Sequence, residues 1–223
     1  MLPRIEDKTI DMIFLDPPYF LSNDGITCSN GKQVSVNKGK WDENFSFEQK
    51  VEFNKKWMIE AKRILKDTGT IWISGTYHNI YIIGYLLEQL GFKILNNITW
   101  EKRNPPPNLA CRCFTHSTET ILWAKKDIKN NKHTFNYSLM KEMNGGKQTK
   151  DVFIGSLTPK SEKKFGKHPT QKPEYLLEKI ILASTNEGDL VCDFMAGSFT
   201  TGVVCKKLKR KFIGIEKEKE FYE

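Results

Sequence analysis

The segment Asp16-Pro17-Pro18-Tyr19 has the residue types that could act on a weakly nucleophilic amine. An amine attached to an aromatic ring reacts poorly because its lone pair is delocalised into the ring. The Asp16 carboxylate and the Pro17 carbonyl would accept its hydrogens and favour a pyramidal nitrogen as positive charge develops. Pro17 and Pro18 fix the backbone, and Tyr19 offers a face on which an extruded base can stack. A turn that merely ends a strand explains the same four residues, so this pattern alone leaves both interpretations open.

A second pair of carboxylates brackets a glycine turn near the carboxyl terminus. Asp193 follows a short apolar stretch, Ala196-Gly197-Ser198 follows it, and Glu216 stands after the next predicted strand. This order is typical of an adenosine-cofactor site, because the turn lets the backbone approach the ligand and the second carboxylate accepts from ribose hydroxyls. A lone glycine turn also occurs in purely structural units, so the pattern is a weak indication by itself.

Short apolar strands alternate with amphipathic helices around both motifs. The sequence predicts strands at Ile10–Leu15, Thr70–Ser74, Phe92–Leu95, Ile98–Trp100, Glu119–Ala124, Asp189–Cys192 and Lys211–Ile215, and helices beginning near Ser46, Asn79, Pro173 and Thr200. Ser46 with Gln49 is a capping-box signature, and the Gly-, Asn- and Ser-rich stretch Ser22–Asp42 predicts a loop. The alternation predicts an α/β fold with a mainly parallel sheet covered on both faces. Ligands bind such sheets at the carboxyl ends of the strands, where Asp16 stands.

The positive charge is concentrated in one part of the chain. Glu101–Lys172 holds fifteen Lys or Arg against six Asp or Glu, whereas the formal charge of the whole chain is +8. A basic block in an otherwise near-neutral protein favours binding of a polyanion, although a solvated surface is the alternative. The sequence is polar and irregular from Asn104 to Gly166 apart from one strand, so we expect an insertion there. Candidates for phosphate or base-edge contacts are Lys102, Arg103, Arg112, Lys125 and Lys126.

Several classes of protein are disfavoured by composition. The five cysteines, Cys28, Cys111, Cys113, Cys192 and Cys205, form no CxxC pair and no Cys/His ligand spacing. They argue against a disulfide framework and a zinc site. No run approaches the ~20 consecutive apolar residues of a membrane span, and no signal peptide precedes the first strand. We therefore expect a soluble, cytoplasmic protein with no membrane association.

Four motifs, in this order, resemble the β class of amino-methyltransferases that act on DNA. They are Asp16-Pro17-Pro18-Tyr19, His168-Pro169-Thr170-Gln171-Lys172-Pro173, Asp193–Gly202 and Phe212–Glu216. The resemblance covers essentially the whole chain. It implies a Rossmann-like S-adenosylmethionine-dependent methyltransferase sheet with helices on both faces, a circularly permuted motif order and a small basic target-recognition insertion. It also implies a catalytic half at 1–100, a target-recognition region at 101–166 and a cofactor-binding half of the same domain at 167–223.

The resemblance assigns roles to individual positions. Asp16, Pro17, Pro18 and Tyr19 would form the catalytic tetrapeptide. Contacts with the cofactor would come from Leu15, Asp16, His168, Thr170, Gln171, Lys172, Asp193, Phe194, Met195, Ala196, Gly197, Ser198, Phe199, Thr200, Thr201 and Glu216. Among these, Thr170, Gln171 and Lys172 would contact the cofactor's methionine end, and Glu216 its ribose. No metal is implied, because transfer from a sulfonium is a direct displacement that needs alignment more than Lewis acidity.

The resemblance also implies a substrate. Family members with serine in place of Asp16 tend to methylate cytosine N4, so aspartate favours adenine N6. Four stretches resemble the second methyltransferases of restriction systems of the DpnII kind, namely Ile71–Gly75, Asn97–Trp100, Thr115–Ala124 and His168–Ser184. This narrower likeness implies methylation of a flipped adenine in GATC, on duplex or single-stranded DNA, alongside a restriction endonuclease. Family members often form homodimers, so monomer and homodimer both stay open.

Two departures from the family pattern keep other functions open. Phe194, Met195 and Phe199 replace a proline, a phenylalanine and a glycine of the usual cofactor loop. If position 199 needs a positive φ, its β-carbon costs about 1–2 kcal/mol, and the ring would also occupy space meant for the ligand. Family members usually have a short strand and helix before the first strand and a closing helix after the last, so we expect this sequence to be either a trimmed or a decayed copy. Phe199 and the short amino terminus favour a catalytically impaired homologue that binds DNA; a cytosine-N4 methyltransferase is the other alternative.

Overall fold

The computed structural model describes residues 2–20, 26–29, 32–35, 45–129, 132–163 and 171–218. In chain order its elements are η1 (Leu2–Arg4), β1 (Ile10–Leu15), β2 (Ile26–Ser29), β3 (Lys32–Ser35), α1 (Phe47–Ile64), β4 (Leu65–Gly75), α2 (Ile80–Gln89), β5 (Lys93–Lys102), β6 (Thr118–Lys125), α3 (Tyr137–Met143), β7 (Val152–Gly155), η3 (Lys160–Glu162), α4 (Glu174–Ser184), β8 (Leu190–Asp193), α5 (Thr200–Lys207) and β9 (Lys211–Gly214). Among the described helices, none is both long and apolar enough to cross a membrane.

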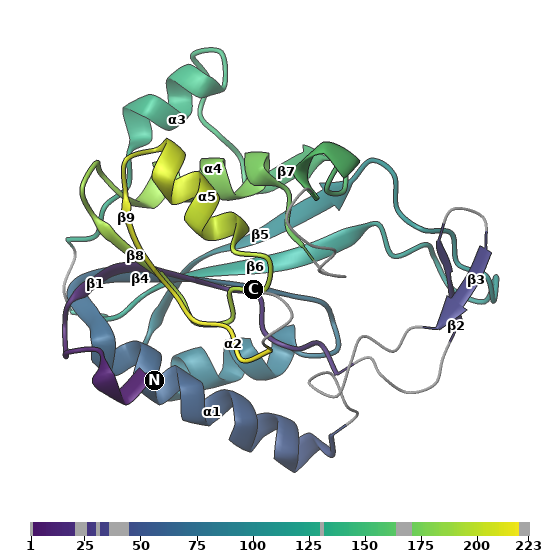
Figure 1. The fold of residues 1–223 in the computed structure, drawn as a ribbon, viewed down its shortest axis with the longest axis horizontal. Coiled ribbons are helices and arrows are strands. Elements are labelled where there is room, and N and C mark those ends of the chain that lie inside the picture. The colour runs from purple at the N-terminus through teal and green to yellow at the C-terminus, as the bar shows by residue number, and fades with distance from the viewer. Residues whose placement is uncertain are drawn as a thin grey trace.

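Seven strands form one mixed sheet in the order β7-β5-β6-β4-β1-β8-β9 (Figure 1). β1 pairs in parallel with β4 and with β8, β8 with β9, and β5 with β7, whereas β6 is antiparallel to both β4 and β5. Six strands therefore end at one edge of the sheet, and only β6 begins there. This arrangement confirms the predicted α/β class and places the ends of β1 and β8 side by side.

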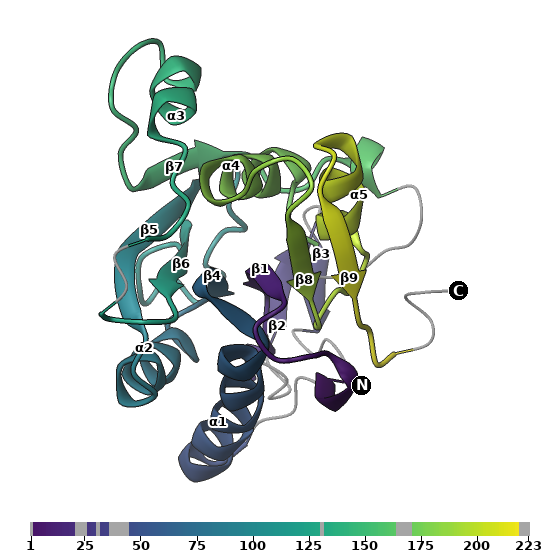
Figure 2. The same cartoon turned by 90° about the vertical axis from the view of Figure 1, so that its left-hand side faces the viewer.

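Helices cover both faces of the sheet and enclose two separate cores (Figure 2). On β1, Ile13 and Leu15 pack into the core beneath α1 and α2, while Met12 and Phe14 pack into the core beneath α4 and α5. Successive side chains of a strand point to opposite faces, so a strand that is buried on both sides is apolar at nearly every position. β1 is held from both faces, which makes it a rigid support for the Asp16 turn that follows it.

The first long helix begins where the sequence predicts it. Gln49 N donates to Ser46 Oγ at 3.3 Å and Ser46 N donates to Gln49 Oε1 at 2.8 Å, which completes the capping box. The helix ends at Ile64, and Leu65 takes an extended conformation and enters β4. β4 therefore starts earlier than the predicted Thr70, and its register with β1 shifts between Ile10 and Met12.

Short elements escaped the sequence prediction. The pattern gave no strand within Ser22–Asp42, but β2 and β3 pair there as antiparallel strands; the rest of that segment lies outside the described residues. The expected irregular region after Asn104 contains α3 and also β7, which pairs with β5 at the edge of the main sheet. Likewise, the two strands predicted on either side of Asn96 are one strand, β5, with an irregularity there. Runs of four residues carry too little periodicity to separate strand from loop.

Candidate active site

The ends of β1 and β8 meet at the point where the chain's connections diverge. β1 continues through α1 to β4 on one side, whereas β8 continues through α5 to β9 on the other side. In open α/β sheets, ligands bind outside the carboxyl ends of the strands at such a switch point. Asp16 follows β1 and Asp193 ends β8, and both line one cleft there. The Asp16 turn and the carboxyl-terminal bend therefore border one cleft.

Most of the residues that were predicted from the sequence to contact the cofactor line this cleft. Predicted residues that line it are Asp16, Gln171, Lys172, Asp193, Met195, Ala196, Gly197, Ser198, Thr200 and Thr201. Phe14 and Leu177 line it as well, and the sequence did not single them out because each reads as a core residue of its element. The cleft has a free volume of only about 40 Å³, whereas ligand pockets commonly hold ~300–1,000 Å³. A cofactor therefore needs the cleft to widen.

Four of the predicted cofactor residues do not line the cleft. Leu15 is fully buried in the core under α1, and Phe194 packs there with its ring centroid 6.1 Å from that of Trp57. The Phe199 ring turns to β9, where it meets Phe212 edge-on. The Glu216 carboxylate contacts the bend by accepting a hydrogen bond from the backbone N–H of Gly197. His168 and Thr170 lie outside the described residues.

Two carboxylates shape the bend after β8. Asp193 accepts from Met195 N at 3.1 Å and from Thr201 Oγ1 at 2.7 Å, and burial raises the pKa of its carboxyl to about 7. Glu216 accepts from Gly197 N at 2.7 Å, where the glycine has a φ of +48°. A positive φ and a backbone N–H directed at a carboxylate are features that glycine provides without strain. The bend is therefore ordered by its own side chains.

Gln171 offers an unused acceptor to a ligand in the cleft. Its Nε2 donates to the Glu162 carbonyl at 2.9 Å, while its Oε1 is buried and has no hydrogen-bond partner among the described residues. A buried acceptor without a donor costs about 1–3 kcal/mol, so a ligand that brings a donor gains that amount. An ammonium group, such as the one at the methionine end of S-adenosylmethionine, fits this position. The residues present therefore fit the cofactor that the motifs imply.

Both oxygens of the Asp16 carboxylate are occupied. Tyr19 donates its hydroxyl to Oδ1 at 2.7 Å, and the Lys172 ammonium donates to Oδ2 at 2.5 Å. The Tyr19 side chain is only 8% exposed, and Lys172 Nζ lies 5.4 Å from the centre of its ring. The sequence suggested an aromatic face open to a base. In this structure the ring is buried and lies beside the ammonium ion, so its availability depends on Lys172.

Glu119 extends this cluster into a network that sequence reasoning missed. Its Oε2 lies 3.2 Å from the Tyr19 hydroxyl oxygen and 3.4 Å from Lys172 Nζ, and its Oε1 lies 2.7 Å from Lys102 Nζ. Ser74 Oγ lies 3.2 Å from the same tyrosine hydroxyl. A glutamate beside the apolar run of β6 was the available signal, because an acidic residue there is rarely buried without a partner.

Charge balance keeps the ions of this network charged. Burial alone lowers the pKa of Lys172, but Asp16 and Glu119 outweigh it, and the net pKa is raised. Burial alone raises the pKa of Glu119, but Lys172 and Lys102 outweigh it, and the net pKa is lowered. Burial and the neighbouring carboxylates hold the pKa of Tyr19 well above its usual value, so its phenol stays neutral. The cluster contains two lysine cations that balance the carboxylates of Asp16 and Glu119.

Asn79 anchors the proline turn from the neighbouring strand end. Its Nδ2 donates to the Pro18 carbonyl at 3.2 Å, and its Oδ1 accepts from Thr76 N at 3.1 Å. A β-carbon at Gly75 would lie 2.6 Å from Asn79 Oδ1, so glycine is needed for this approach. The sequence indicated Asn79 only as the start of a helix. The structure shows that it also holds the turn after Asp16.

Comparisons with known proteins decide the family. A profile of the family described as DNA methylase, for N6 and N4 enzymes, matches residues 10–223. The chain belongs to the DNA methylase family. It is 65% identical to the type II methyltransferase M2.DpnII of Streptococcus pneumoniae over 99% of this chain and 82% of that protein. It is 54% identical to M2.MboI of Moraxella bovis, over the whole of this chain and 81% of the other.

Solved structures agree with this family. The M1.HpyAVI–SAM complex superposes with a TM-score of 0.67 at 30% identity, covering 96% of this chain and 86% of the other. The cytosine-N4-specific PvuII DNA methyltransferase superposes with a TM-score of 0.78 at 19% identity, covering 99% and 79%. The second likeness concerns the fold alone. The chain is thus a DNA methyltransferase, built on a sheet that solved DNA methyltransferases share.

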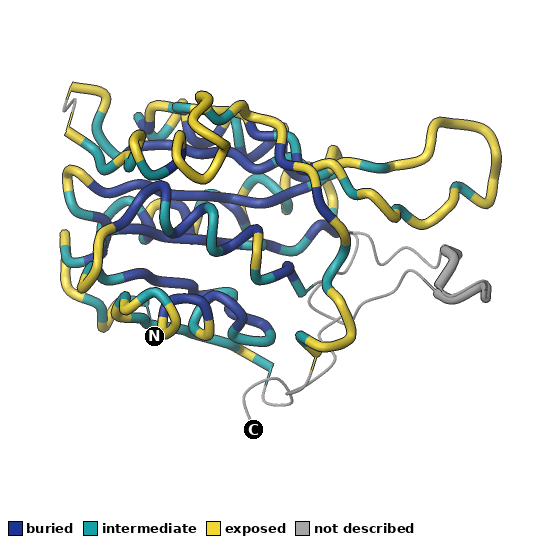
Figure 3. The backbone as a smooth tube through the Cα atoms, turned by 90° about the horizontal axis from the view of Figure 1, so that it is seen from above, coloured by how far each residue is buried: buried dark blue, intermediate teal, exposed yellow. Residues whose placement is uncertain are grey.

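The basic residues that were predicted to contact DNA lie at two opposite edges of the sheet. The connection from β5 to β6 is exposed along most of its length and leaves the sheet at the edge where β1 and β8 end (Figure 3). Arg103 and Arg112 belong to this connection. Lys102 is paired with Glu119 and its side chain is 12% exposed. Lys125 is buried, and Lys126 donates to the Leu65 carbonyl at 2.5 Å, at the opposite edge of the sheet. The two arginines therefore lie at the edge of the sheet that carries the cleft, and the last two lysines lie at the opposite edge.

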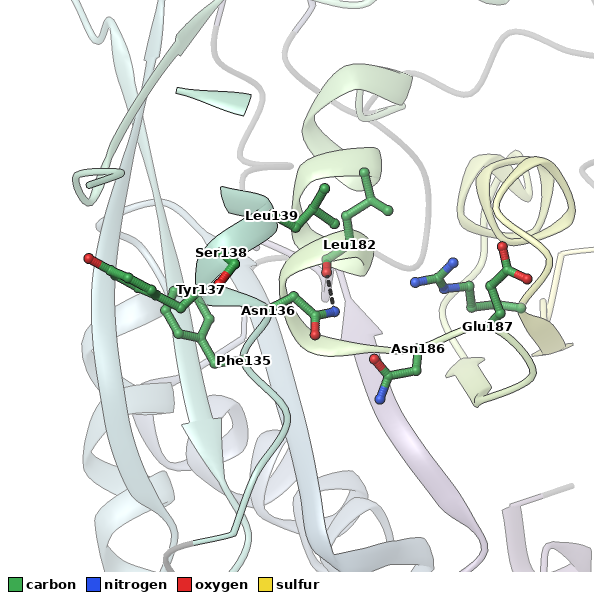
Figure 4. Close-up of a pocket in the computed structure, with 9 residues that line it drawn as sticks. Phe135, Asn136, Tyr137, Ser138, Leu139, Leu182, Asn186 and Glu187 are labelled. Atoms are coloured by element: carbon green, nitrogen blue, oxygen red, sulfur yellow. Dashed lines mark hydrogen bonds between the residues drawn. The ribbon is translucent and has the colours of Figure 1, made fainter. Parts of the chain in front are cut away.

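A wider hollow of about 650 Å³ lies elsewhere on the methylase, beside the start of α3 (Figure 4). It is bordered by the connections into β8 and β9, at the amino ends of these strands. Its polar groups are used internally: Asn136 donates to Leu182 O at 2.8 Å, and Arg210 donates to Thr185 O at 2.8 Å. Size alone does not make it the active site, because the candidate catalytic groups lie at the other edge.

Replacement of Gln171 tests the unused acceptor in the cleft. Gln171→Leu and Gln171→Glu both remove the Nε2 donor to Glu162, but only the glutamate keeps an oxygen at the position of Oε1. We expect the leucine variant to bind S-adenosylmethionine about tenfold more weakly than the glutamate variant, because a hydrogen bond to a charged group contributes about 1.5–3 kcal/mol. Titration calorimetry measures both affinities. Equal affinities would show that this oxygen does not contact the cofactor.

Replacement of Phe199 tests the backbone of the bend. Phe199 has a φ of +56° and precedes α5, so its β-carbon is strained by about 1–2 kcal/mol. The cleft must widen for a ligand, and we expect Phe199→Gly to tighten S-adenosylmethionine binding severalfold because glycine lets the bend adjust. Phe199→Ala removes the ring but keeps the strain, so calorimetry should show no such gain for alanine. Unchanged or weaker binding by the glycine variant would contradict the strain argument.

Proposed function

We propose that this chain methylates the exocyclic N6 of adenine at a specific DNA site, GATC, as the modification enzyme of a restriction system. The observation that carries the proposal is the cleft at β1 and β8, which the Asp16 turn and the bend after Asp193 line together. Aspartate at position 16, where cytosine-N4 enzymes tend to have serine, favours adenine. The high identity to M2.DpnII and M2.MboI, over nearly the whole chain, supports both the site and the restriction system.

The methyl donor is S-adenosylmethionine, which supplies a methyl group on a positively charged sulfur when it is bound. The bend from Asp193 to Thr201, with Glu216 behind Gly197, would hold it. Gln171 would accept a hydrogen from its ammonium end. Once the cofactor fills the cleft, these residues would also exclude water from the reacting atoms, which strengthens the electrostatic contacts there.

The Asp16 turn would prepare the amine. The Asp16 carboxylate and the Pro17 carbonyl would accept the two amine hydrogens and direct the nitrogen lone pair at the methyl carbon. As the nitrogen–carbon bond forms and the carbon–sulfur bond breaks, the nitrogen becomes positive and loses one proton, which Asp16 is placed to accept. Asn79 keeps the turn in position through Pro18 O, and this reduces the reorganisation that the reaction requires.

The organisation of the chain follows from this assignment. The catalytic strand β1 comes first and the cofactor unit β8-α5-β9 last, which is the circularly permuted motif order, with halves at 1–100 and 167–223. The basic region 101–166 between them would recognise the target, with Arg103 and Arg112 facing DNA in duplex or single-stranded form. The proposal holds for a monomer and for a homodimer alike. A DNA substrate places the enzyme in the cytoplasm.

Nucleoside analysis tests the proposed reaction. The protein is incubated with isotopically labelled S-adenosylmethionine and a GATC duplex, and the digested DNA is analysed by mass spectrometry. We expect labelled N6-methyladenine, none in a duplex whose GATC sites are scrambled, and a rate about 10²- to 10³-fold lower for Asp16→Ala, which removes an acceptor aimed at the developing charge.

The other outcomes separate the alternatives. Labelled N4-methylcytosine would assign the chain to the cytosine-N4 enzymes. Absence of label with intact DNA binding would make the protein a catalytically impaired DNA-binding homologue, the reading that Phe199 favours.

A further inference from the structure

The ammonium group of Lys172 occupies the position that a substrate amine needs. It donates to Asp16 Oδ2 at 2.5 Å, and Tyr19 donates to the other oxygen, so both acceptors of the catalytic carboxylate are in use. A cation at this point also resembles the positively charged nitrogen that methyl transfer creates. Lys172 is therefore a placeholder for the adenine amine, and the amine can bind Asp16 only after Lys172 has moved.

We propose that Glu119 is a positioning residue that takes Lys172 over from Asp16 when the adenine amine arrives. The inference rests on the proposed adenine methylation. Lys172 Nζ already lies within ion-pair distance of Glu119 Oε2, at 3.4 Å, so rotations of its long side chain can bring it onto Glu119 and away from Asp16. Asp16 and Glu119 are the carboxylates that pair with Lys172 among the described residues.

The same displacement would prepare the place for the base. Lys172 Nζ now lies 5.4 Å from the centre of the Tyr19 ring. A movement of the ammonium group toward Glu119 takes the positive charge away from that side of the ring. Lys172 Nζ also donates to the Tyr19 hydroxyl at 3.1 Å, and the hydroxyl keeps its contacts with Asp16, Glu119 and Ser74 when that bond is given up. One movement of Lys172 therefore releases an acceptor for the amine and removes the cation from beside the Tyr19 ring.

Burial explains why a second carboxylate is needed. The side chains of Lys172 and Glu119 are only 5% and 11% exposed, and separating a buried ion pair without replacing the lost partner is strongly destabilising. Glu119 is itself held by Lys102 at 2.7 Å and by the pairing of β6 with β4 and β5. It therefore stays in place as an anion while Lys172 changes partners. A purely structural Glu119, which only ties β6 to the cluster, is the competing explanation.

The test compares binding of two duplexes and needs no turnover. One carries the target adenine in GATC; in the other, purine, which lacks the exocyclic amine, replaces that adenine. Fluorescence anisotropy gives both dissociation constants, and their ratio reports the contacts to the amine, because the cost of unpairing each base is the same for all variants. We expect Glu119→Gln to lower the preference for adenine about tenfold or more, since Lys172 then keeps Asp16 occupied.

Three further variants distinguish the transfer of Lys172 from Asp16 to Glu119 from a purely structural role of Glu119. In a Lys172→Met background, Glu119→Gln should change the preference less than about threefold, because no ammonium remains to be transferred. Glu119→Asp keeps the charge and should retain most of the preference. Glu52→Gln, which removes an exposed carboxylate that is also 3.4 Å from a lysine, should behave as the wild type.

Each contrary result has one meaning. An unchanged preference in folded Glu119→Gln protein, or an equal loss with and without Lys172, overturns the exchange and leaves Glu119 a structural residue. Thermal denaturation shows whether Glu119→Gln folds; if it does not, Glu119→Asp decides the matter, and a loss of preference of about tenfold in folded Glu119→Asp protein overturns the exchange. If wild-type protein produces no N6-methyladenine, the proposed function fails instead, and the nucleoside analysis shows this independently of any variant.

Discussion

The candidate active site depends on one buried ion-pair cluster. Lys172 comes from the segment before α4, Asp16 from the end of β1 and Glu119 from the start of β6, and they meet where water is largely excluded. A buried charge must stay paired, so the three elements cannot separate without a large loss of stability. The cluster therefore fixes the catalytic turn against the sheet and links it to the cleft, which Lys172 also lines.

This constraint gives the resting enzyme a defined state. An unpaired Asp16 carboxylate at the base of a narrow cleft would attract water or cations, whereas Lys172 occupies it until a better partner comes. The cofactor bend is likewise satisfied internally, through Asp193, Thr201 and the contact between Glu216 and Gly197. The ligands of this site replace existing contacts, so specificity follows from which molecule replaces them best.

Local chemistry could be predicted from the sequence, whereas partners across the fold could not. The capping box at Ser46, the turn after β1 and the glycine bend depend on neighbouring residues, and the structure has them where they were expected. Lys125 and Lys126 were expected to contact DNA because they belong to the basic block of the sequence. β6 runs antiparallel to its neighbours, so its last residues lie at the edge opposite Asp16. Glu119 stands at the start of β6, so the same antiparallel direction brings it to the edge of the sheet where Asp16 lies.

The most direct test is a crystal structure of the protein with a GATC duplex and a non-transferable analogue of S-adenosylmethionine. The account predicts the analogue in the cleft beside Asp193, an extruded adenine with its amine at Asp16, and Lys172 Nζ closer to Glu119 than to Asp16. An analogue bound outside this cleft, or an adenine amine at Asp16 with Lys172 still on the same carboxylate oxygen, would contradict it.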